Sequence, residues 1–297
     1  MKAVKRLLVA LLALGTALFA ASELSTPANS APYYSPAARQ CLLIAHMGGD
    51  KLWPGDTRYA YDQAARLGVD VFDMDVHITR DGVIVLMHDD TLSRTTGAPG
   101  EVEDFSYSEL EGLDAARDWT PDKGATYPYR GKGIKVTRLE DLFVAYPDMR
   151  YLIEIKNSKN PIARPLADLI HRYSMQRKVI VASFHDGLLN EFRRAAPDVA
   201  TSASRKEVTT FVLLSKIGLS GLISPRYQAL QVPYDSKESL GIRILSPGFI
   251  RAAHAKNLRV ETWTLDDPAL MKKYISWGID GIDTDKPDVL KAVLSGL

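Results

Sequence analysis

From residue 41 onward, short apolar runs alternate with longer stretches of helical spacing. The apolar runs are rich in β-branched residues and predict strands at 42–45, 69–76, 83–87, 151–156, 179–184, 199–202, 229–232, 260–264 and 279–284. The helical patterns predict helices at 59–67, 138–145, 163–173, 188–195, 206–216, 247–256 and 268–277, with Thr57 as the cap of the first. Strands that alternate with helices in this way predict an α/β fold with a parallel sheet and crossover helices.

The number of strands and the length of the chain favour one closed barrel. A (β/α)8 TIM barrel needs about 250 residues, and residues 41–297 of the 297-residue chain provide them. Nine strand candidates compete for eight places, so one of them is misassigned or accessory. Residues 91–135 form a segment that is rich in Gly and Pro and too long for an ordinary loop. We interpret this segment as an insertion after the third strand that caps one face of the barrel.

One connection is too short for a crossover helix, because only 77–82 separate Asp75 from the next strand. The dipeptide Asp81-Gly82 predicts a hairpin with a two-residue turn. That turn pairs Arg80 with Val83 and, counting back, places Asp75 opposite His88. Paired residues lie about 5 Å apart on one face. This local geometry therefore predicts a functional site where the carboxylate of Asp75 and the imidazole of His88 meet.

The N-terminus has the pattern of an export signal. Lys2 and Lys5 precede an uncharged apolar run over 7–20, which is shorter than the ~20 residues of a membrane span and ends in small residues. Residues 1–21 are therefore interpreted as a cleaved signal peptide, with an uncleaved N-terminal membrane anchor as the alternative. Residues 22–40, rich in Ser, Pro and Ala, are expected to form a flexible leader, and the protein is expected to be exported, periplasmic or secreted.

Composition excludes several classes of partner and chemistry. Lys plus Arg (37) nearly balance Asp plus Glu (36), so no nucleic-acid partner is expected. The single cysteine, Cys41, excludes an internal disulfide, and its apolar surroundings favour a buried, idle thiol. The sequence leaves the oligomeric state open.

Three acidic residues interrupt apolar strand runs. Asp73 and Asp75 lie two apart and share a face of their strand, and Glu154 lies within the run 151–156. Charges in such places are costly unless paired or metal-bound, and three convergent carboxylates suit one divalent cation, Mg2+ or Ca2+. Lys156 shares a face with Glu154, so a buried salt bridge from Lys156 to Glu154 or Asp73, without metal, is the competing interpretation.

Two histidines, His46 and His88, follow apolar strands near these acids. Paired imidazoles supply one general base and one general acid near neutral pH, which hydrolysis of a phosphodiester can use. Trp263 lies at another strand end, where it either walls a pocket or packs in the core. The remaining histidines, His77, His171, His185 and His254, are expected to have structural or surface roles.

These residues resemble the glycerophosphodiester phosphodiesterases of the phospholipase-C-like phosphodiesterase barrel group. The resemblance runs from about Leu43 to the C-terminus and rests on six ordered blocks: 45–49, 73–82, 88–96, 154–156, 263–264 and 281–287. It implies a cation held by Asp73, Asp75 and Glu154, catalysis by His46 and His88, Lys156 near the phosphate and Trp263 near the alcohol or acyl part. The implied substrates are small-molecule glycerophosphodiesters or, as in lysophospholipases D, lysophospholipids, with a peripheral membrane contact possible.

The sequence departs from the family pattern at three places. Met47 stands where an arginine usually contacts phosphate, Asp73 where a glutamate is usual, and Gly55-Asp56 where the family has Glu-Asn. These changes place the substrate in doubt and leave a catalytically silent, phospho-ligand-binding relative as the alternative function. A barrel enzyme that acts on sugars with a pair of acids is disfavoured, because such a mechanism gives no role to His46 and His88 at the strand ends.

Overall fold

The structure is a computed structural model that describes residues 4, 6, 16, 22, 24–34, 41–156, 158–239 and 241–296. The predicted signal peptide, residues 1–21, lies almost entirely outside these residues. Within the described part of the chain, no helix is both long and apolar enough to cross a bilayer.

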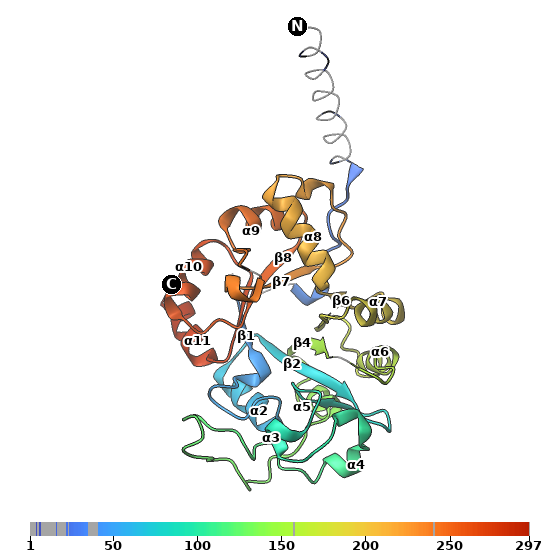
Figure 1. Cartoon of the computed structure of the whole chain (residues 1–297), viewed down its shortest axis with the longest axis vertical. Helices are drawn as coiled ribbons and strands as arrows, with labels where there is room; N and C mark the ends of the chain where they lie inside the picture. Colours follow the sequence, from blue (N-terminus) through green and yellow to red (C-terminus); the bar gives the residue numbers. More distant parts are fainter. Residues whose placement is uncertain are drawn as a thin grey trace.

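Eight parallel strands form the barrel, which confirms the predicted fold class (Figure 1). In chain order they are β1 (Leu42–Ala45), β2 (Val71–Ile78), β4 (Arg150–Ile155), β5 (Val179–Ala182), β6 (Ala200–Thr201), β7 (Ala229–Pro233), β8 (Arg259–Trp263) and β9 (Gly281–Thr284). The order around the sheet is β6-β5-β4-β2-β1-β9-β8-β7. A parallel bridge between Ser202 and Ala229 brings β6 beside β7 and nearly closes the barrel.

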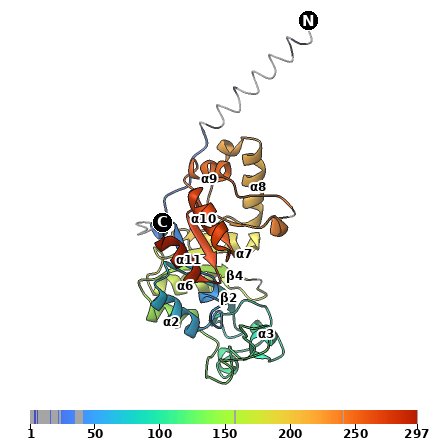
Figure 2. The ribbon, with the colours of Figure 1, turned by 90° about the vertical axis from the view of Figure 1, so that its left-hand side faces the viewer.

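Helices surround the strands, as Figures 1 and 2 show from two directions. They are α2 (Arg58–Leu67), α5 (Leu139–Ala145), α6 (Ala163–Arg172), α7 (Asp186–Ala195), α8 (Arg205–Lys216), α9 (Pro247–His254), α10 (Pro268–Ser276) and α11 (Pro287–Ser295). The short 3-10 helices η4 (Ser220–Leu222) and η5 (Ser236–Ser239) lie in the connections around β7. Thr57 caps α2 as predicted, because its hydroxyl accepts a hydrogen bond from the amide of Ala60.

The ninth strand candidate is accessory: β3 (Ile84–Leu86) pairs antiparallel with β2 and stays outside the barrel order. The hairpin register predicted from Asp81-Gly82 is wrong by one residue. Thr79 pairs with Val83 across a three-residue loop, and Asp75 lies opposite Met87, whose amide donates to its carbonyl at 3.0 Å. The Thr79 hydroxyl explains the longer loop, since it donates to Asp81 and accepts from the amide of Val83.

Strand alternation divides the barrel interior into an apolar layer and a polar layer. The apolar cluster contains Leu42, Ile44, Val71, Leu152, Ile180, Ala200 and Ala229, most of which lie in the first half of their strands. Two residues further along each strand, side chains point into the same interior. Further along β2, β4 and β9, the inward positions are therefore filled by Asp73, Asp75, Glu154 and Asp283. Glu261, in the middle of β8, lies at the level of the apolar layer, since it is in register with Gly281 and, through it, with Leu42.

Part of the predicted flexible leader belongs to the fold. The 3-10 helix η1 (Pro32–Tyr34) places Tyr33, only 1% exposed, within the apolar cluster at the amino-terminal end of the barrel. The Tyr34 hydroxyl donates to Oε1 of Glu261 at 2.9 Å, and the amide of Ala28 donates to the carbonyl of Lys256. This segment closes one end of the barrel and leaves the carboxyl end for the site.

The insertion has a small core of its own. It contains α3 (Ser93–Thr96), the 3-10 helix η3 (Val102–Asp104) and α4 (Tyr107–Leu110). A separate apolar cluster joins it to β3 and comprises Val85, Met87, Leu92, Val102, Leu110, Ala115 and Val136. This packing fixes the chain that follows β3, and with it the position of His88.

Candidate active site

His46 begins the short helix η2 (His46–Gly48) directly after β1. Its Nδ1 lies 2.7 Å from Oδ1 of Asp285, which orients the ring and leaves Nε2 for other partners. Burial alone lowers the pKa of His46, but the Asp285 hydrogen bond and the charges of Asp73 and Asp75 outweigh it and raise the pKa to about 10. Without a bound cation, the imidazole is thus the group that offsets the surrounding negative charge.

His88 reaches the same cavity from the end of the hairpin, although it is not paired with Asp75. Its Nδ1 lies 2.8 Å from Oδ1 of Asp89. Asp89 is held in turn by Arg94 through two contacts of 2.5 and 3.1 Å. The chain His88–Asp89–Arg94 fixes the imidazole ring much as Asp285 fixes His46.

Asp75 and Glu154 lie side by side on β2 and β4, with Lys156 between them. The Lys156 ammonium contacts Oδ1 of Asp75 at 2.9 Å and Oε1 of Glu154 at 3.2 Å. Burial and the neighbouring Asp75 nevertheless raise the pKa of Glu154 to about 7. Oδ2 of Asp75 is buried and has no hydrogen-bond partner among the described residues, so the Lys156 ammonium does not satisfy both carboxylates.

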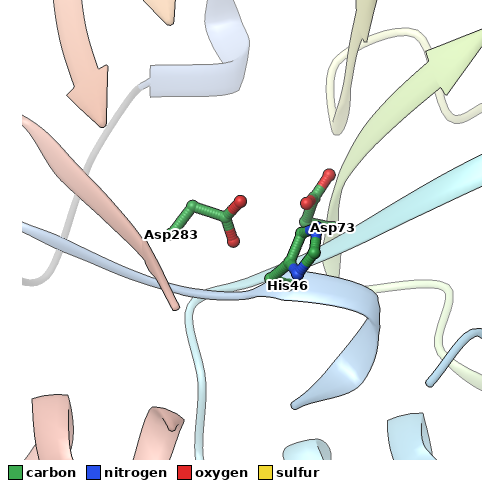
Figure 3. Close-up of side chains that lie close together, drawn as sticks. All are labelled: His46, Asp73 and Asp283. Carbon is green, nitrogen blue, oxygen red and sulfur yellow. The ribbon is translucent and has the colours of Figure 1, made fainter. Parts of the chain in front are cut away.

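Asp73 faces a residue that the sequence analysis did not select, Asp283 on β9 (Figure 3). Among the described residues, His46, Asp73 and Asp283 form a group in which one ligand atom from each lies within 4.8 Å of the others. Burial raises the pKa of both carboxyls, and the charge of Asp283 raises that of Asp73 further. The three predicted metal ligands are thus divided, with Asp73 beside Asp283 and the other two beside Lys156.

A cavity of about 680 Å3 opens above these groups and is lined by His46, His88, Asp73, Glu154, Lys156 and Trp263, six of the seven predicted site residues. The seventh, Asp75, is buried at 4% exposure beneath them. The rings of Trp263 and Phe184 meet edge to face, 5.7 Å apart. The rest of the wall is largely apolar and comes from β5 to α9: Ala182, Val208, Val212, Leu213, Pro233, Ile242 and Ile244.

Two of the departures from the family pattern contact one another. Met47 has a positive φ of 50° and is buried against the loop that contains Gly55. A Cβ at Gly55 would lie 2.5 Å from Oδ1 of Asp50 and 3.0 Å from Cβ of Met47, so no larger residue fits here unless the loop moves. Both line a second cavity beneath the insertion, with the basic residues Lys51, Arg94, Lys123 and Lys286.

The comparison with known families decides the assignment of this site. The model of the glycerophosphoryl diester phosphodiesterase family matches residues 46–289, most of the chain. The chain belongs to this family. It is a phosphoric diester hydrolase of the glycerophosphodiester phosphodiesterase type, as the blocks around His46, Asp73 and His88 indicated.

Relatives match over nearly their whole length. A glycerophosphodiester phosphodiesterase from Caldanaerobacter subterraneus is 30% identical over 257 residues, covering 84% of this chain and 96% of the relative. A lysophospholipase D from Mus musculus is 24% identical over 273 residues, covering 85% of each.

Solved structures of this family share the fold. A glycerophosphoryl diester phosphodiesterase domain from Mycobacterium tuberculosis superposes with a TM-score of 0.74 at 18% identity and covers 86% of this chain and 99% of that one. A phosphodiesterase from Oleispira antarctica, in complex with the product sn-glycerol-3-phosphate, has a TM-score of 0.65 at 21% identity and covers 85% of this chain and 96% of that one.

The residues present fit a bound divalent cation. Among the described residues, four buried carboxylate oxygens have no hydrogen-bond partner: Oδ2 of Asp56, Oδ2 of Asp75, Oδ1 of Asp283 and, in the insertion, Oε1 of Glu103. Oxygen ligands of this kind suit Mg2+ or Ca2+. Of these acids, only Asp75 was predicted. Asp283 could have been found by the criterion that identified Glu154, since both are acids within an apolar strand. Asp285 directly follows β9, the strand that contains Asp283.

Proposed function

We propose that this protein hydrolyses glycerophosphodiesters to glycerol 3-phosphate and an alcohol, with His46 and His88 as the acid and base. The observation that carries the proposal is that both imidazoles line one cavity with Asp73, Glu154 and Lys156. Each imidazole has one nitrogen held by a carboxylate, which leaves the other free for proton transfer.

The reaction needs a proton acceptor and a proton donor on opposite sides of phosphorus. One imidazole accepts the proton of the attacking water, and the other donates a proton to the oxygen of the leaving alcohol. Lys156 lines the cavity, so its ammonium can attract a phosphate there, where burial strengthens charge interactions. Arg94 holds Asp89 and so keeps His88 in position.

We assign Asp73, Asp75 and Glu154 as the residues that would hold one Mg2+ or Ca2+. When bound, the cation neutralises charge on the non-bridging phosphate oxygens. The orphaned Oδ2 of Asp75 supports this assignment, whereas the contacts of Lys156 with Asp75 and Glu154 support the competing salt bridge. Removal of the cation is therefore the test that separates the two interpretations.

A lysophospholipid is the second candidate substrate, and the apolar wall of the cavity favours it. These apolar side chains come from the β5 to α9 region and not from the insertion 91–135. Phe184, Leu213 and Ile242 line the cavity and are 42%, 56% and 44% exposed. They would lie against an acyl chain and provide any peripheral contact with a membrane.

Leu213→Gln tests the acyl role. We expect kcat/KM for lysophosphatidylcholine to fall about 3- to 10-fold, the loss of ~1 kcal/mol of apolar contact, and kcat/KM for glycerophosphocholine to stay unchanged. Choline release from both substrates is the measurement. Ile217→Gln is the matched control, since Ile217 is 67% exposed near the same helix but does not line the cavity. An equal effect on both substrates would contradict an acyl site at Leu213.

The silent-relative alternative makes the opposite forecast for the same assay. A phospho-ligand-binding protein would release choline from neither substrate, whatever the cation. Met47 and Gly55 were the residues that favoured this alternative. Their mutual contact is compatible with a phosphate pocket of altered shape and also with the loss of phosphate binding.

Export remains a prediction from the N-terminal sequence. Lys2, Lys5 and the apolar run over 7–20 support a signal peptide. N-terminal sequencing of the protein recovered from outside the cytoplasm checks this. An N-terminus at residue 1 would support the membrane anchor instead.

A further inference from the structure

Asp73 and Asp283 lie against each other in the barrel, beside the imidazole of His46. Within the described part of the chain, no lysine or arginine forms an ion pair with either carboxylate, because Lys156 is engaged by Asp75 and Glu154. Both residues are buried, at 6% and 5% exposure, and Oδ1 of Asp283 has no hydrogen-bond partner. Two buried carboxylates side by side are costly unless a proton or a cation offsets their charge.

We propose that His46, Asp73 and Asp283 form a second cation position, for a transition-metal dication such as Zn2+ or Co2+. Asp73 is shared with the position formed by Asp75 and Glu154. Asp285 holds Nδ1 of His46, so an ion at this position would occupy the nitrogen that the proposed reaction uses for proton transfer and would inhibit hydrolysis.

The spacing of the three side chains fits one ion. Ligand atoms that lie about 2.1–2.4 Å from a common ion are separated by up to about 4.2–4.8 Å. One ligand atom from each of His46, Asp73 and Asp283 lies within 4.8 Å of the others. Figure 3 shows the Asp283 carboxylate turned toward the other two side chains. All three line the open cavity, which gives an ion a path from solvent.

The type of ligand distinguishes this position from its neighbour. Asp75 and Glu154 offer only oxygen, which hard cations such as Mg2+ and Ca2+ prefer. His46 adds an imidazole, which shifts the preference toward Zn2+, Co2+ and related ions. The second position should therefore take a transition metal while Mg2+ occupies the first.

A shared proton is the competing explanation for the pair. In that arrangement one carboxyl is neutral and hydrogen-bonds the other, and no metal is needed. Asp283→Asn separates the two explanations, because an asparagine amide still donates a hydrogen bond to Asp73 but cannot supply a carboxylate to a cation.

The experiment is equilibrium dialysis of the whole chain against Co2+ at saturating Mg2+, with bound cobalt counted by mass spectrometry. We expect one Co2+ per wild-type chain and an affinity about tenfold or more weaker in Asp283→Asn and in His46→Ala. Glu261→Gln is the matched control and should bind as wild type. Glu261 is a buried acid of the same cavity, but Tyr34 and Gln231 already satisfy its oxygens.

Each other outcome overturns the proposal. Wild-type cobalt binding in Asp283→Asn, or no bound cobalt in the wild type, assigns the pair to a shared proton. If Asp283→Asn fails to fold by circular dichroism, His46→Ala decides alone, because His46 lies outside the strands. The measurement uses no substrate, so its outcome is independent of the hydrolysis assay. A protein that binds cobalt but releases no choline under Mg2+ alone would support the second cation position and contradict the proposed hydrolysis.

Discussion

Replacement of His46 by alanine is expected to lower kcat for glycerophosphocholine by about a hundred- to ten-thousand-fold, the usual contribution of a general acid or base. His46 lines the cavity, and Asp285 holds its Nδ1, so the variant removes a positioned proton carrier. Choline release under saturating Mg2+ or Ca2+ measures the loss. His88→Ala should have an effect in the same range, since His88 lines the same cavity.

His171→Ala is the control for this prediction. His171 lies on α6 and pairs with Asp198 at the surface, away from the cavity residues. Its replacement should leave kcat within about twofold of wild type, as for most surface substitutions. Near-wild-type activity of both His46→Ala and His88→Ala would remove the two-histidine mechanism.

Glu154→Gln is expected to weaken Mg2+ or Ca2+ binding by about tenfold or more, because even groups outside the first shell of ligands contribute that much. Glutamine keeps the shape and volume of Glu154 but not its charge. The salt-bridge interpretation forecasts a different result, a loss of stability from the Lys156 contact at 3.2 Å with no change in cation affinity. Isothermal titration with each cation, together with urea unfolding, measures both quantities.

Glu191→Gln is the matched control for this variant, because Glu191 is an exposed residue of α7. It should change neither cation affinity nor stability. Unchanged cation affinity in Glu154→Gln, with a lower free energy of unfolding, would assign Glu154 to the salt bridge with Lys156.

The strands were predictable because burial within a barrel leaves a local signature. Runs such as 151–156 and 229–232 are apolar, short and bounded by polar residues, and they fall within about two residues of β4 and β7. The hairpin register was not predictable from Asp81-Gly82 alone. Two- and three-residue loops both accept that dipeptide, and the Thr79 hydroxyl selects the longer one.

The places of His46, Asp73 and Glu154 in the cavity wall were predictable, because each is an acid or imidazole within or directly after an apolar run. The neighbours of these residues were harder to predict, because contacts such as His46 with Asp285 join strands that are distant in the chain. The burial of Tyr33 could not be predicted from the sequence around it. Tyr33 is buried only because the amino-terminal end of the barrel accepts its ring, and that end is formed by strands distant from Tyr33 in the chain.

The most direct test is the release of glycerol 3-phosphate from glycerophosphocholine by the wild-type chain, before and after EDTA and after Mg2+ or Ca2+ is restored. We expect product with the cation, none after chelation, and recovery on its return. Two results would contradict catalysis by imidazoles and carboxylates around a cation at the carboxyl end of the barrel. One is product formation that EDTA does not reduce, and the other is no product under any of these conditions.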